Sequence, residues 1–165
     1  MQSRGSTLKR FPELPYPDDT YVTEFGNRLI YDELQYNPSE LQSEYEALYA
    51  ALTSEQRTVF DTIMTSVEQG SGGTYFVYGY RGTGKTYLWR TLAAGIRRKG
   101  DIVINVASSG IASLLMSGGR TAHSRFHIPI NIDETSTCSI SPQSDLGRLL
   151  KKMQTYSLGR SPNDK

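Results

Sequence analysis

The pattern that most constrains this chain is a glycine-rich loop between an apolar run and a helical pattern. The segment Gly79 to Thr86 reads G-Y-R-G-T-G-K-T and matches G-x-x-x-x-G-K-T without a mismatch. The run before it, Tyr75 to Tyr78, favours a β-strand, and apolar residues recur at helical spacing from Leu88 to Ile96. Strand, glycine loop and helix in this order predict a phosphate-binding loop.

The residue types in this loop suit a nucleotide polyphosphate. Glycines let backbone N–H groups turn inward and approach a ligand closely, and the following helix directs its N–H groups at the same phosphates. Lys85 is placed to reach the β- and γ-phosphates, and the Thr86 hydroxyl to ligate Mg²⁺. An ordinary glycine turn is the alternative, and the flanking patterns disfavour it. The expected nucleotide-binding residues are Gly79, Tyr80, Arg81, Gly82, Thr83, Gly84, Lys85 and Thr86.

Charge is spread unevenly along the chain, although the formal net charge is only +1. Residues 1–70 carry 12 acidic and 5 basic side chains, whereas residues 71–165 carry 5 acidic and 13 basic ones. A basic half that contains the phosphate loop fits phosphate-rich ligands, but a solvated basic face gives the same count. Cys138 is the only cysteine of the sequence, which excludes an internal disulfide and a cysteine-based zinc cluster.

The remaining patterns divide the chain into an arm, a domain and a tail. Three prolines within residues 1–20 are typical of an extended arm, and residues 21–50 show the spacing of two short helices that separate at Pro38. We expect a proline-rich arm with short helices over residues 1–50 and a partial P-loop domain over residues 51–153. A divergent tail over residues 154–165 completes the division.

Gln56 has two possible roles. Thr53 with a glutamine three residues later fits a capping box at the start of a helix whose apolar positions run from Val59 to Val67. This spacing favours capping. A glutamine just ahead of a P-loop domain can instead read the adenine edge, so both roles stay open on the residues alone.

Two segments after the phosphate loop are suited to nucleic acid. Residues 102–107, although they include Asn105, are apolar enough for a parallel strand that is buried on both faces, and Ser108-Ser109-Gly110 follows its carboxyl end, where open α/β sheets bind ligands. The segment Arg120 to Phe126 combines basic, hydroxyl and aromatic groups, which suit phosphate contacts and base stacking. A lone histidine such as His123 is more often a structural hydrogen-bonding residue. The fold class that these patterns predict is α/β with a parallel sheet.

Four ordered stretches resemble the eukaryotic PIF-type (petite integration frequency) DNA helicases, most closely the plant and Helitron-related branch. The stretches are Leu52 to Gln56, Gly79 to Thr86, Val106 to Ala112 and Gly118 to Phe126. The resemblance implies a RecA-like P-loop NTPase with a three-layer parallel sheet. It also implies an ATP- and Mg²⁺-dependent motor that moves 5′ to 3′ on single-stranded DNA, with roles in repair, recombination and telomere maintenance in the nucleus, or alternatively in the mitochondrion.

The resemblance also assigns roles by position. Gln56 corresponds to the adenine-reading glutamine of the family, and Lys85 and Thr86 to its catalytic lysine and Mg²⁺ ligand. The expected DNA contacts are Ser108, Ser109, Gly110, His123, Ser124 and Arg125. Because LKRFPELPYPD also resembles a segment upstream of the motor, we expect Met1 to begin within a longer ancestral protein.

The chain departs from the family pattern near its end. The family has an acidic pair after a later strand, in a motif much like LIVWDEAPM, where the aspartate helps to hold Mg²⁺ and the glutamate orients the attacking water. This chain instead ends KKMQTYSLGRSPNDK, with neither an apolar strand nor an acidic pair, so we expect a disordered tail. One choice of synonymous codons for residues 155–165 reads LIVWDEAPMT in a shifted frame, which suggests that the tail is this motif read out of frame. The transcript sequence tests that hypothesis.

The activity expected of this chain is low because it lacks the acidic pair. It also lacks the second domain, which supplies arginines to the γ-phosphate in the family. Charge stabilisation by such an arginine is worth roughly 10³–10⁵ in rate. We therefore expect a truncated helicase fragment that is competent at most for nucleotide binding, with little ATPase and no unwinding activity. The alternatives are a P-loop nucleotide-binding module that is not a helicase, and an inactive gene remnant.

Overall fold

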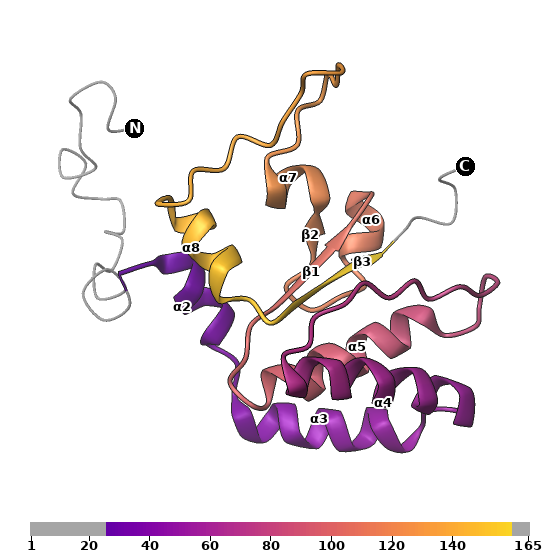
Figure 1. Cartoon of the computed structure of the whole chain (residues 1–165). Helices are drawn as coiled ribbons and strands as arrows, with labels where there is room; N and C mark the ends of the chain where they lie inside the picture. The colour runs from indigo at the N-terminus through magenta and orange to yellow at the C-terminus, as the bar shows by residue number, and fades with distance from the viewer. Residues whose placement is uncertain (1–25, 160–165) are drawn as a thin grey trace, which may run out of the picture.

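A parallel sheet of three strands, in the order β2–β1–β3, organises residues 26–159, the part of the chain that the computed structural model describes. The strands are β1 (Val103–Ala107), β2 (Arg120–Thr121) and β3 (Thr155–Gly159). Val106 of β1 lies opposite Arg120 on one side and Leu158 on the other. Because all strands run in the same direction, their carboxyl ends meet at one edge of the sheet (Figure 1).

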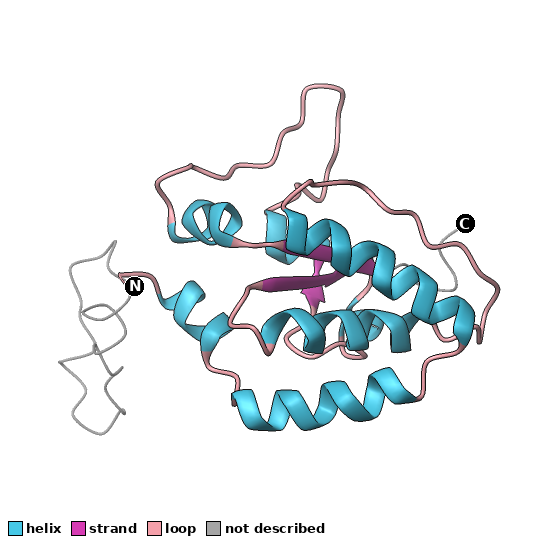
Figure 2. Cartoon of the chain, turned by 60° about the horizontal axis from the view of Figure 1, so that its bottom comes forward, coloured by secondary structure: helices cyan, strands magenta, loops and turns pink. Residues whose placement is uncertain are grey.

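Helices cover both faces of this sheet (Figures 1 and 2). Within residues 26–159 they are α2 (Arg28–Leu34), α3 (Pro38–Ala50), α4 (Ser54–Gln69), α5 (Lys85–Arg97), α6 (Gly110–Ser113), α7 (Ala122–Phe126) and α8 (Asp145–Lys152). None of them is long and apolar enough to cross a membrane.

Alternate side chains of β1 enter two separate hydrophobic clusters. Val103 packs into the cluster built by α4 and α5, to which the tyrosines of α3 add their rings. Ile104 and Val106, which are fully buried, pack on the other side with α2 and α8, and Phe126 of α7 joins them. The strand is thus apolar on both faces, as its sequence predicts. The resulting order of layers is helix, sheet and helix.

The helix boundaries follow from local capping. Asn37 accepts a hydrogen bond from the Ser39 amide at 3.0 Å, and Pro38 occupies the first turn of α3, where a missing N–H has no cost. Gly70 ends α4 in the left-handed conformation, at a φ of 59°. The two short helices predicted around Pro38, and the helix predicted after Thr53, are therefore confirmed.

The segment before the phosphate loop is not a strand, which contradicts the prediction for Tyr75 to Tyr78. Val77 packs on the α4–α5 cluster, but Phe76 and Tyr78 are 88% and 77% exposed. In the described residues no strand pairs with this segment, because the sheet ends at β3. Strand formation requires a neighbour that pairs with the backbone N–H and C=O groups, and β-propensity alone does not provide one.

Part of the tail is ordered, whereas the sequence predicts a disordered tail. Residues 155–159, expected to be disordered, form β3 and pair along the whole length of β1. The pairing begins where the Gln154 amide donates a hydrogen bond to the Ile102 carbonyl at 3.0 Å. A buried neighbouring strand therefore orders a segment whose own sequence gives only a weak strand signal. The predicted proline-rich arm over residues 1–20 and the end of the tail lie outside the described residues, so the domain boundaries stay a prediction.

Candidate nucleotide and nucleic-acid site

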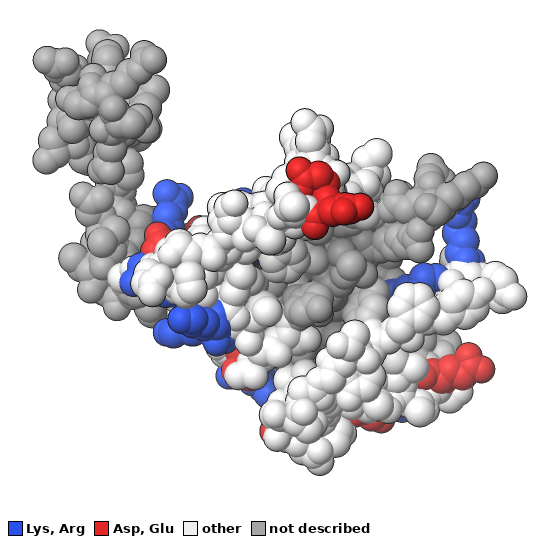
Figure 3. All heavy atoms as spheres, turned by 45° about the horizontal axis from the view of Figure 1, so that its top comes forward, with Lys and Arg blue, Asp and Glu red and all other residues white. Residues whose placement is uncertain are grey.

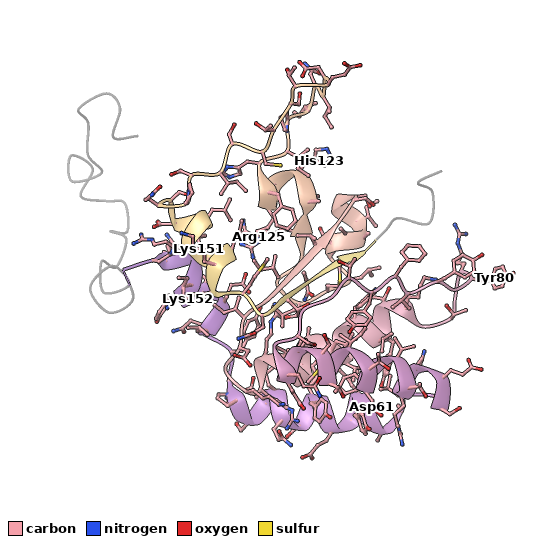
Figure 4. The ribbon with its side chains drawn as sticks, viewed as in Figure 1. Asp61, Tyr80, His123, Arg125, Lys151 and Lys152 are labelled. Atoms are coloured by element: carbon pink, nitrogen blue, oxygen red, sulfur yellow. The ribbon has the colours of Figure 1, made fainter. Side chains whose placement is uncertain are left out.

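The phosphate loop leads directly into the N-terminus of α5. Gly82 and Gly84 have φ angles of 83° and 77°, which lie in the left-handed region that glycine adopts without strain. A Cβ atom at Gly84 would also lie 2.5 Å from the Gln56 Nε2 atom, so a larger residue there would displace the end of that side chain. The loop lies at the outer end of the molecule, where Tyr80 projects away from the helices (Figure 4). The backbone therefore has the form that the motif predicts.

Lys85 lies within the arc of the loop. Its Nζ atom donates hydrogen bonds to the carbonyl oxygens of Gly79 at 2.6 Å and Tyr80 at 2.8 Å. The ammonium group is therefore held by carbonyl oxygens of the loop itself. The Thr86 side chain, at the second position of α5, is exposed and accessible to a metal ion held by the phosphates. The two residues together fit a Mg²⁺-nucleotide, with Lys85 as the cation and Thr86 as the hydroxyl ligand.

Gln56 performs the capping role and also contacts the phosphate loop. Its Oε1 atom accepts a hydrogen bond from the Thr53 amide at 3.1 Å, and the Thr53 hydroxyl accepts one from the Gln56 amide at 3.3 Å. The capping box is therefore confirmed. The Gln56 Nε2 atom donates to the Thr83 carbonyl at 3.0 Å. This contact joins α4 to the phosphate loop and places the glutamine amide beside it, while the adenine-reading role stays a prediction.

Most of the predicted DNA contacts lie at the carboxyl edge of the sheet. Ser108, Ser109 and Gly110 follow β1, and His123 and Ser124 lie on α7, which follows β2. Ser109 caps α6 by accepting a hydrogen bond from the Ala112 amide at 3.3 Å. His123 and Ser124 are exposed, and Figure 4 shows His123 on the outer side of α7. Because β1 and β2 are parallel, the two segments lie at the same edge of the sheet.

Arg125 does not lie on that surface, which contradicts its prediction as a DNA contact. Its side chain is only 6% exposed and forms an ion pair with Glu33 of α2. One turn of α7 separates Arg125 from Ala122, which packs on the buried cluster, so both residues face inward while His123 and Ser124 face solvent. No local pattern indicates Glu33 as the partner, because it precedes Arg125 by 92 residues.

Glu33 also holds a second buried arginine. The Glu33 Oε2 atom lies 3.6 Å from the nearest guanidinium nitrogen of Arg97, at the C-terminal end of α5. The Arg97 guanidinium donates hydrogen bonds to the carbonyls of Val103 and Ser117, both at 3.0 Å, and stacks over the Tyr36 ring at 4.3 Å. One carboxylate and two guanidinium groups therefore join α2, α5 and α7.

The shifted pKa values lie outside the phosphate loop. The pKa of Glu68 is lowered by the hydrogen bond and charge of Lys99, and the pKa of Asp133 is lowered by hydrogen bonds from Thr135 and Ser136. No group of three or more His, Cys, Asp or Glu residues converges within residues 26–159.

Comparison with known proteins relates this chain to DNA helicases. The sequence profile of the PIF1-like helicase family matches residues 51–158, which include Gln56, the phosphate loop and nearly all of β3. The chain is also 27% identical over 129 residues to ATP-dependent DNA helicase PIF4 of Trypanosoma brucei brucei. That match covers 74% of this chain but only 15% of the relative, so the chain corresponds to a small part of that protein.

Proposed function

The chain belongs to the PIF1-like helicase family, and on that premise we propose that it binds ATP with Mg²⁺ at the phosphate loop and single-stranded DNA at the carboxyl edge of the sheet. The observation that carries the proposal is the loop Gly79 to Thr86, whose glycines adopt left-handed conformations and whose lysine lies inside the arc. The phosphate loop is part of a RecA-like domain of the kind that, in a complete motor, moves 5′ to 3′ on single-stranded DNA. Repair, recombination and telomere maintenance in the nucleus are the processes that such a motor serves.

We further propose that ATP is bound far better than it is hydrolysed. In P-loop motors an aspartate helps to hold Mg²⁺ and a further polar side chain orients the attacking water. The segments that follow the three strands are Ser108-Ser109-Gly110, Ala122-His123-Ser124 and Arg160-Ser161, none of which contains a carboxylate. β3 therefore occupies a place beside β1 without supplying the acidic pair of the family. The out-of-frame origin of the tail stays a hypothesis that the transcript sequence tests.

DNA binding separates this proposal from a nucleotide-binding module of another class. We expect the chain to bind a fluorescein-labelled oligothymidine, with log K falling by about 0.7 per phosphate contacted for each unit of log salt. Replacing both His123 and Ser124 with alanine should weaken binding at low salt, and MgATP affinity should not change. Fluorescence anisotropy at several salt concentrations measures this. Undetectable DNA binding by the unaltered chain at 50 mM salt, together with normal MgATP binding, would favour the other class.

Gln56 gives a second test, because its two roles can be separated. Replacing Gln56 with alanine should lower ATP affinity by about 2- to 12-fold, the effect of one lost hydrogen bond of about 0.5–1.5 kcal/mol, and leave GTP affinity unchanged. Thr53→Ala is the matched control: it also breaks the capping box, at a cost of about 0.5–2 kcal/mol in stability, but keeps the glutamine. Titrations with ATP and GTP measure the difference. Equal loss of ATP affinity in both variants would assign Gln56 to capping alone.

A further inference from the structure

A pocket of about 440 Å³ lies between α2, α7, α8 and the loop that connects α7 to α8. It lies outside the phosphate loop, and three of its lining residues, Arg120, Ser124 and Arg125, belong to the segment Arg120 to Phe126 that the sequence predicts to contact DNA. Its volume falls in the range of small-ligand sites, about 300–1,000 Å³. We propose that this pocket binds a phosphate group of the DNA strand, together with part of the attached sugar; the inference rests on the proposed function.

The charges around the pocket favour an anion. Arg120, the exposed first residue of β2, is the cation of the pocket wall that has no carboxylate partner among the ion pairs of the described residues, and the imidazole ring of His127, the residue that ends α7, also lines the wall. Behind them lies the buried cluster of one carboxylate and two guanidinium groups, formed by Glu33, Arg97 and Arg125, which adds a net positive charge. Arg125 also lines the pocket but is committed to Glu33. Such an arrangement lowers the energy of a phosphate and raises that of a cation.

The carboxylate in the wall does not cancel this charge. The Asp145 Oδ1 atom accepts a hydrogen bond from the Arg148 guanidinium at 2.5 Å, so its negative charge is balanced by a cation outside the pocket lining. Figure 3 shows basic side chains gathered on the side of the molecule where α2 and α8 lie. The electrostatic environment of the pocket is therefore positive on balance.

The uncharged lining suits a nucleotide backbone. Ser124, Ser139 and Ser141 supply hydroxyl groups, which are common donors to phosphate oxygens in protein–DNA contacts. Leu29 and Leu146 form an apolar part of the wall, against which a deoxyribose can pack. A free phosphate ion uses the cations and the hydroxyls but not the leucines. Because Ser124 lines the pocket and lies on the exposed face of α7 with His123, a strand crossing α7 can place one phosphate in the pocket.

The test compares Arg120→Ala with Arg90→Ala in the complete chain. Arg90 is an exposed arginine of α5, on the opposite side of the sheet, and pairs with Glu44 of α3. With a fluorescein-labelled oligothymidine as the probe, Arg120→Ala should weaken binding and lower the slope of log K against log salt by about 0.7, the value for one phosphate on a single strand. Arg90→Ala should retain the unaltered slope, and both variants should retain MgATP affinity and thermal stability.

The outcomes separate the inference from the function on which it rests. If the unaltered chain binds the oligonucleotide and Arg120→Ala binds it with the same affinity and slope, the pocket proposal is wrong while the proposed function stands. If the unaltered chain binds no oligonucleotide, both fail. A last experiment adds inorganic phosphate at constant ionic strength and follows the melting temperature. If it raises the melting temperature of the unaltered chain but not of Arg120→Ala, and DNA binding is equal in the two, the site holds free phosphate and the strand contact is overturned.

Discussion

Replacing Glu33 with alanine should lower the free energy of unfolding by about 3–5 kcal/mol, the usual cost of removing one partner from a buried ion pair. Glu33 is 7% exposed and lies between the guanidinium groups of Arg97 and Arg125. Without it, two buried cations face each other with no carboxylate. Because a typical domain is stable by about 5–15 kcal/mol, the loss is a large part of the total. Urea unfolding followed by circular dichroism measures it.

Glu44→Ala is the matched control for this prediction. Glu44 also pairs with an arginine, Arg90, but the two side chains are 42% and 47% exposed. Solvent screens such a pair, so its loss should cost about 0–1 kcal/mol. Glu33→Gln, which keeps the size and removes the charge, should be nearly as unstable as Glu33→Ala. Equal urea midpoints for Glu33→Ala and Glu44→Ala would show that the buried cluster does not hold α2, α5 and α7 together.

Replacing Lys85 with alanine should raise the dissociation constant for MgATP by about 10- to 150-fold. The estimate corresponds to about 1.5–3 kcal/mol for one hydrogen bond to a charged group. The Nζ atom is already within the loop, where it donates to the carbonyls of Gly79 and Tyr80, so it can exchange these acceptors for phosphate oxygens with little movement. Isothermal titration calorimetry with MgATP measures the change.

Lys99→Ala controls for the loss of a lysine from the same part of the chain. Lys99 follows α5 at its opposite end and pairs with the exposed Glu68. Its removal should leave MgATP affinity unchanged and return the pKa of Glu68 towards its ordinary value, because Lys99 is the main cause of the lowered pKa. If Lys85→Ala binds MgATP as tightly as Lys99→Ala does, the loop is not the nucleotide site.

The features that the sequence predicts correctly depend on local patterns. The capping box at Thr53, the glycine loop and the apolar strand after Gly100 each need only a few neighbouring residues to be recognised, and each forms where its pattern lies. Helix capping, backbone conformation and the spacing of apolar residues are properties of short segments, and tertiary packing reinforces them in this fold. The position of Ser108 and His123 at one edge follows in turn from the parallel order of β1 and β2.

The predictions that are wrong concern residues whose partners are distant in sequence. Tyr75 to Tyr78 has strand-forming residues but no strand beside it among those described, whereas residues 155–159 have a weaker signal and pair with β1. Arg125 occurs in a motif that resembles a DNA contact, yet its nearest anion is Glu33, 92 residues earlier. Strand pairing and buried ion pairs are decided by tertiary neighbours, which no local window contains.

The central claim, that the chain holds ATP without turning it over, can be tested by one single-turnover measurement. Excess protein is mixed with radiolabelled ATP, Mg²⁺ and oligothymidine, and the fraction bound and the fraction converted to ADP are followed together. We expect ATP to be retained and to remain intact for many minutes, because among the described residues the segments that directly follow β1 and β2 hold no carboxylate for general-base assistance, which is worth about 10²–10⁴ in rate. Conversion of the bound ATP at about 1 per second or faster, as in ordinary enzymes, would contradict it.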